Sequence, residues 1–189
     1  MRGNPKRAIL KKSIEIGSGR IRGYDFDKKF DAKDFFESYN DTGLQATNLG
    51  TAISLVKKMR NDNAYIFLGF TSNVTTSGLR DIITYLVRNK LVNFIVTTTG
   101  GVEEDIIKTH GNFLHGSFYA SGEMLRKKGV NRTGNIFIPN ERYIWFEDFM
   151  KCLLSRLYKE QIKTGNIIDS RNFIREMGQE MEREKRKDE

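Results

Sequence analysis

AYIFLGF, residues 64–70, is a continuous apolar run of strand length, and LVNFIVTTT, residues 91–99, is a second one. Uninterrupted apolar runs of this kind are typical of strands that are buried on both faces of a sheet. The segment between them, residues 77–90, has its apolar residues at helical spacing. A strand, a helix and a strand in this order predict a parallel sheet covered by helices.

The same alternation extends outward on both sides of this unit. A third short strand is predicted over residues 135–140, closed by Pro139, and we expect it to continue the sheet. Further helices are predicted over residues 32–39 (begun by Asp31), 44–60, 102–110, 121–129 and 141–163, with a last one begun by Asp169 or Ser170. The fold class is therefore α/β, a Rossmann-like open parallel sheet with helices on both faces. Three strands make only about half of such a sheet, so we expect a partner chain to complete it.

Two predicted helices have a clear apolar face. In the first, the apolar residues recur at spacings of three and four: Leu49, Ala52, Ile53, Val56 and Met59. In the long helix at 141–163 we expect seven side chains to point inward: Ile144, Phe146, Phe149, Met150, Leu153, Leu154 and Leu157.

Composition indicates a globular protein of a reducing compartment. The 189 residues are 38% hydrophobic and 30% charged, and Cys152 is the single cysteine, so no disulfide can form within the chain. No run approaches the roughly 20 apolar residues that span a bilayer, and the basic amino end is not followed by a secretory apolar segment. We expect a cytoplasmic location and no membrane partner.

The formal net charge of +8 raises the possibility of nucleic-acid binding. Much of the excess is local, since five basic residues precede residue 13, and basic residues elsewhere alternate with acids. No recognition helix, zinc finger or RNA-binding aromatic motif is present. We expect no nucleic-acid partner, and an RNA-binding module is only a remote alternative.

Two consecutive predicted strands end in polar segments, TSNVTTSG (71–78) and TTTGGVEED (97–105). Ligands of open parallel sheets bind beyond the carboxyl ends of the strands. Hydroxyls, an amide and glycine-exposed backbone N–H groups suit ribose hydroxyls, phosphates or an amide. The simpler alternative is that Ser72, Asn73 and Ser77 cap a helix and that Gly100–Gly101 make a tight turn. Two adjacent loops of the same chemistry favour a ligand cleft.

Three carboxylates, Glu103, Glu104 and Asp105, follow the second loop. In the first turn of a helix they would be stabilised by the helix dipole, which is one explanation for them. They would also repel a phosphate at the same helix end, whereas a cationic ligand such as an amine suits them. The pattern predicts a nucleotide-like site beside an anionic amine site. No metal site is expected, because His110 and His115 lack acidic or cysteine partners at useful spacing, and Trp145 is most simply a core residue.

Several long strings resemble the deoxyhypusine synthase family, in order and at family-like spacing. They are RGYDFD, TGLQATNLGTAI, FLGFTSN, TSGLRDIITYLV, VTTTGGVEEDIIK, NRTGNIFIPNERY and FEDFM. The resemblance runs from about Arg22 to about Gly178 and covers the amino-terminal half of the family. It implies NAD as cofactor, spermidine as substrate, and transfer of an aminobutyl group, through an imine on an enzyme lysine, to a lysine of the translation factor 5A precursor.

The resemblance also implies roles for individual residues. The implied NAD contacts are Ser72, Asn73, Val74, Thr75, Thr76, Thr98, Thr99, Gly100 and Glu104. The implied spermidine contacts are Glu103 and Glu104. On this basis we divide the chain into a basic, weakly ordered segment (1–22), an NAD- and spermidine-binding half-domain (23–178) and a charged helical tail (179–189).

The family continues for about as many residues again, and that second half carries the nucleophilic lysine. We therefore expect no catalytic residue in this chain and no activity from it alone. The favoured hypothesis is a split deoxyhypusine synthase, in which the chain joins a carboxy-terminal half subunit in a hetero-oligomer resembling a tetramer of halves. The alternatives are a non-catalytic paralogue that regulates a full-length enzyme, and truncation of a longer chain.

Overall fold

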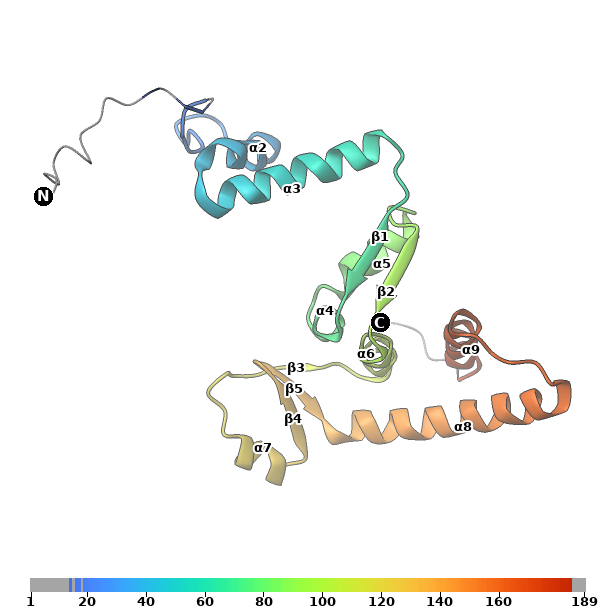
Figure 1. Cartoon of the computed structure of the whole chain (residues 1–189). Helices are drawn as coiled ribbons and strands as arrows, with labels where there is room; N and C mark the ends of the chain where they lie inside the picture. The colour runs from blue at the N-terminus through green and yellow to red at the C-terminus, as the bar shows by residue number, and fades with distance from the viewer. Residues whose placement is uncertain (1–13, 15, 18, 185–189) are drawn as a thin grey trace, which may run out of the picture. The chain divides into compact units, whose positions relative to one another are not determined.

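The computed structural model describes residues 14, 16–17 and 19–184 (Figure 1). Most of the predicted basic segment, 1–22, and the end of the predicted tail, 185–189, lie outside the described residues. The chain forms two compact units, one reaching Ala64 and the other beginning at Tyr65. Among the described residues, no helix combines the length and apolar character needed to cross a bilayer.

The first unit is a pair of helices, α2 (Ala32–Thr42) and α3 (Leu44–Asn61), which pack against each other. Asp31 begins α2 as predicted, since its side chain accepts a hydrogen bond from the Asp34 amide at 2.9 Å. The helices approach so closely that a Cβ at Gly50 would lie 2.6 Å from the Asn40 backbone nitrogen. Both predicted helices are confirmed, but Leu49 and Val56 of the apolar face of α3 are about half exposed.

The second unit contains the predicted parallel pair, β1 (Phe67–Phe70) and β2 (Phe94–Thr97). Parallel strands need a crossover connection, which α4 (Ser72–Thr76) and α5 (Arg80–Arg88) supply. The polar segment at 71–78, expected to be a loop, is therefore largely the helix α4. Its threonines favour this turn because the Thr75 hydroxyl donates back to the Ser72 carbonyl at 2.7 Å, and the Thr76 hydroxyl lies 3.0 Å from the same carbonyl.

The prediction of a third parallel strand was wrong. The segment forms β5 (Ile136–Pro139), which pairs antiparallel with β4 (Val130–Thr133) and β3 (Leu114–His115) in the order β3-β5-β4. Only Gly134 and Asn135 separate β4 from β5, and Gly134 has a φ of +57°. A two-residue hairpin of this kind joins antiparallel strands, whereas a parallel pair requires a long crossover.

The prediction of strands buried on both faces was also wrong for β1 and β2. Neither contains a buried residue, and Phe67 and Phe94 are 65% and 51% exposed with their rings 5.3 Å apart. Among the described residues, each strand pairs along one edge only, so its other edge has no neighbouring strand. One apolar face of the pair is exposed as well.

The core of the second unit is helical. It lies among α6 (Thr99–His110), α8 (Asn140–Thr164) and α9 (Ser170–Arg183), which the Asp169 side chain begins. Its buried members are Ile106, Phe149, Leu153, Leu157 and Met177. Ile144 and Leu154, expected to point inward, are 61% and 48% exposed because they lie off the one face of α8 that packs on its neighbours. The predicted helix at 121–129 is α7 (Gly122–Lys127), capped by Ser121.

Candidate functional site

The two polar strand ends lie side by side. A single residue separates β1 from α4 and β2 from α6, so both helices begin at the carboxyl end of the parallel pair. The cap residues Thr71 and Thr98 make no side-chain cap hydrogen bond. A Cβ at Gly100 would lie 3.2 Å from the Ser72 Cβ, so glycine allows the two segments to approach.

The glycine pair lies inside α6 and does not precede it. Gly100 and Gly101 belong to the first helical turn, where a Cβ at Gly101 would overlap the Thr97 hydroxyl. That hydroxyl is buried and has no hydrogen-bond partner within the part of the chain that the structure describes. The expectation that Glu103, Glu104 and Asp105 occupy the first turn was wrong. Because the effect of the helix dipole falls off within that turn, the dipole explains these carboxylates poorly.

The three carboxylates have different surroundings. Asp105 Oδ1 lies 2.5 Å from the Arg80 guanidinium of α5, which ties it to the scaffold. The Glu104 carboxylate accepts a hydrogen bond from the Thr76 hydroxyl of α4. Glu103 has no hydrogen bond or ion pair to another described residue. The run therefore contains one structural carboxylate and two that remain available to a ligand.

Burial and the adjacent Glu103 charge raise the pKa of Glu104, while the Lys108 charge opposes this shift. The same pair acts on Tyr143 of α8, whose pKa is raised by burial and then by Glu104 and Glu103. Tyr143 is thus a neighbour of the carboxylates that the residue pattern did not predict, although it lies in the family-like string NRTGNIFIPNERY. An ammonium group between Glu103 and Glu104 would relieve this repulsion.

The predicted NAD contacts fall into two groups. The Ser72 hydroxyl and the side chains of Asn73, Thr98 and Thr99 make no hydrogen bond to other described side chains or backbone, so they are available to a ligand. Thr75 and Thr76 are buried, the Thr75 hydroxyl donates to the backbone of α4 and the Thr76 hydroxyl donates to Glu104, which makes both residues supports of that segment. Free hydroxyls and an amide beside two uncapped helix starts fit the ribose and phosphate groups of a dinucleotide.

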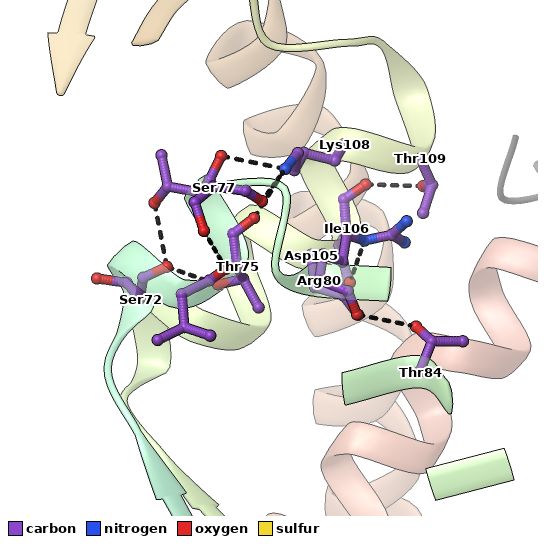
Figure 2. Close-up of polar contacts among 11 residues, drawn as sticks. Ser72, Thr75, Ser77, Arg80, Thr84, Asp105, Ile106, Lys108 and Thr109 are labelled. Carbon is purple, nitrogen blue, oxygen red and sulfur yellow. Dashed lines mark hydrogen bonds and ion pairs between the residues drawn. The ribbon is translucent and has the colours of Figure 1, made fainter. Parts of the chain in front are cut away.

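Figure 2 shows two further residues that hold α4 and α5 against α6, Arg80 and Lys108. The sequence reasoning missed both. The histidines lie elsewhere: His110 stacks on Trp145 with ring centroids 4.3 Å apart, and His115 lies in β3 with Asn135 3.4 Å away. Among the described residues, no group of three or more His, Cys, Asp or Glu side chains is arranged to hold a metal.

Comparison with known proteins decides the family. The family model described as deoxyhypusine synthase matches residues 34–187 of the 189. The chain belongs to the deoxyhypusine synthase family. It is 41% identical over 183 residues to the "Probable deoxyhypusine synthase" of Pyrococcus furiosus, covering 94% of this chain and 54% of that protein. The protein of the same name from Drosophila melanogaster is 38% identical over 199 residues, covering 92% and 54%.

A solved structure gives the same result for the fold. A crystal structure from Entamoeba histolytica, of a protein assigned as a deoxyhypusine synthase, matches with a TM-score of 0.56 and 31% identity, covering 84% of this chain and 54% of that chain. The predicted resemblance and the α/β class are thereby confirmed. The chain spans about half the length of the deoxyhypusine synthase relatives that it matches.

Proposed function

We propose that this chain supplies the NAD and spermidine contacts of a deoxyhypusine synthase, and that a second chain supplies the other half of the family's length with the nucleophilic lysine. One observation carries the proposal: the Thr76 hydroxyl of α4 donates to the Glu104 carboxylate of α6. This bond joins the segment that fits a dinucleotide to the carboxylates that fit an amine. An oxidant and an amine bound there would be neighbours, as hydride transfer between them requires.

The proposed roles follow the surroundings of each residue. Bound NAD would accept a hydride from spermidine. The Ser72, Asn73, Thr98 and Thr99 side chains would bind its polar groups, Val74 and Gly100 would contact it, and Thr75 and Thr76 would hold the segment in place. Glu103 and Glu104 would bind an ammonium group of spermidine, and Glu104, through its position beside Thr76, would also lie against the cofactor.

The partner half would complete the site. The chain covers 54% of the Pyrococcus protein and of the Entamoeba chain, and the proposed partner half would supply the part of the family's length that this chain does not span. The two-stranded parallel sheet, with an exposed apolar face, supports a partner at that position. We propose a hetero-oligomer of such halves, with the translation factor 5A precursor as acceptor of the aminobutyl group.

The test is reconstitution. The chain is co-expressed with the lysine-bearing half from the same genome, and the complex is incubated with NAD, spermidine and the factor 5A precursor. Mass spectrometry should detect aminobutyl addition to one lysine of the precursor for the complex and none for either chain alone. An inactive complex that instead alters a full-length enzyme would support a regulatory paralogue. Failure of the two halves to associate would exclude the split enzyme. The intact mass of the native protein establishes whether the two halves are separate polypeptides.

A further inference from the structure

The ammonium group of Lys108, on α6, makes three hydrogen bonds. It donates to the carbonyl oxygens of Thr75, Thr76 and Ser77, at 2.8, 3.1 and 2.9 Å. Figure 2 shows the ammonium directed at the end of α4. A lysine ammonium has three donors, so these three acceptors match its capacity.

These carbonyls need a partner. The last four carbonyls of a helix have no N–H donor within that helix, and α4 has only five residues. Thr75 and Thr76 are 4% and 2% exposed, so water has little access to two of the three residues whose carbonyls Lys108 binds. A cation at the carboxyl end of a helix is also favoured by the helix dipole.

We infer that Lys108 is a positioning residue for the cofactor segment: its ammonium fixes the end of α4, and with it residues 72–76, against the helix that carries Glu103 and Glu104. The inference rests on the proposed function, because it assumes that α4 binds NAD. Lys108 lies one turn after Glu104 on α6, so a single helix would set both the amine-binding carboxylates and the position of the dinucleotide segment.

The contacts also distinguish this role from that of an imine-forming lysine. Burial and the Arg80 charge lower the pKa of Lys108, a feature that activated lysines share. Nucleophilic attack, however, needs a neutral amine with an accessible lone pair. Three carbonyl acceptors stabilise the ammonium form instead, and they hold it against the backbone of α4.

The experiment compares Lys108→Met and Lys108→Arg with a matched control, Lys151→Met, which removes an exposed lysine of α8. Calorimetry on the complex with the lysine-bearing half gives the Kd for NAD without spermidine, and the Kd for spermidine at saturating NAD. For Lys108→Met we expect the Kd for NAD to rise about tenfold or more and that for spermidine to change less than about threefold. Lys108→Arg should give an intermediate loss, because a guanidinium keeps the charge but not the convergent donor geometry.

Amide hydrogen exchange on the full chain alone gives a second, activity-free measurement. Lys108→Met should speed exchange at the Val74 amide of α4 and at the Ser77 amide directly after it, while β1 and β2 keep their protection. Unchanged NAD affinity in Lys108→Met would overturn the positioning role. Faster amide exchange throughout the second unit, as expected if that unit unfolds, would overturn it as well. A wild-type complex that does not bind NAD would instead exclude the proposed function, so the two failures are distinguishable.

Discussion

The Nε atom of Arg80 lies 2.5 Å from Oδ1 of Asp105, and the Arg80 side chain is only 12% exposed. This ion pair joins α5 to α6 and gives the last of three consecutive carboxylates a structural role. Glu104 instead faces Thr76 of α4, and Glu103 has no partner among the described residues. The three acids are therefore expected to respond differently to substitution.

Glu103→Gln and Glu104→Gln should each weaken spermidine binding by the reconstituted complex. A charge-assisted hydrogen bond contributes about 1.5–3 kcal/mol, which corresponds to roughly a ten- to hundredfold rise in Kd. Calorimetric titration with spermidine measures this change. Glu147→Gln, which removes an exposed carboxylate of α8, is the control and should bind as the wild type does. Equal affinities for all three variants would remove the carboxylate pair from the amine site.

Asp105→Ala should destabilise the chain and leave the amine site intact. The mostly buried Arg80 guanidinium would lose a short charge-assisted bond, at a cost of about 1–3 kcal/mol in the free energy of unfolding. Urea unfolding of the chain measures that cost, and titration of the complex measures spermidine affinity. Unchanged stability combined with lost spermidine affinity would instead assign Asp105 to the amine.

The stability of Glu104→Gln should depend on pH in a direction that the environment of Glu104 sets. Its pKa is raised in the folded chain by burial and by Glu103, so the protonated form is favoured on folding. This contribution is fully present below the unfolded pKa and is lost as pH rises through the folded pKa. At neutral pH, where the wild type carries the unfavourable charge, we expect Glu104→Gln to be more stable than the wild type.

The comparison needs urea unfolding of both chains, without spermidine, from neutral to acidic pH. The advantage of Glu104→Gln should shrink on acidification, since both side chains are then neutral. A variant less stable than the wild type at neutral pH would contradict the repulsion between Glu103 and Glu104. Together with weaker spermidine binding, a gain in stability is typical of a residue retained for function.

Sequence periodicity predicted the helices other than α4, because their caps and apolar spacing are local. Asp31, Ser121 and Asp169 each cap the helix that follows them. The sheet was harder, since the apolar run at β5 is compatible with either kind of pairing, and the turn at Gly134 decides in favour of an antiparallel hairpin. Burial depends on what packs on each face, which explains why apolar β1 and β2 are exposed here.

For the candidate site, chemistry predicted that two polar segments would adjoin, but it did not indicate which residues hold them together. The segments 71–78 and 97–105 were expected to be adjacent, and the structure places Ser72 against Gly100. The support from Lys108 and Arg80 was missed because both contacts cross more than 20 residues of sequence, and a lone basic residue on a helix carries no sign of its acceptor.

Asn73→Ala should weaken NAD binding by the complex more than spermidine binding. The side-chain amide of Asn73 makes no hydrogen bond to other described residues, so removing it should leave the chain's own stability unchanged. Each hydrogen bond lost contributes about 0.5–1.5 kcal/mol, or a rise in Kd of roughly two- to tenfold. The NAD affinity of the complex and the thermal midpoint of the chain are the measurements. Asn48→Ala, which changes an amide of α3 that bonds Gln45, is the matched control. An NAD affinity equal to that of the wild type would place Asn73 outside the site.

Phe67→Ser and Phe94→Ser should weaken association with the lysine-bearing half. The two rings lie 5.3 Å apart on one face of the β1–β2 pair, and both are more than half exposed in this chain. Covering an aromatic side chain contributes about 1.5–3 kcal/mol, so each change should raise the Kd between the halves by roughly tenfold or more. Tyr119→Ser, at a side chain that is 97% exposed and lies outside the sheet, should leave that Kd unchanged. Sedimentation of the mixed halves measures association, and urea unfolding measures the chain's own stability. A large fall in stability with no change in association would mean that the chain's own fold covers this face, and the partner would then have to dock elsewhere.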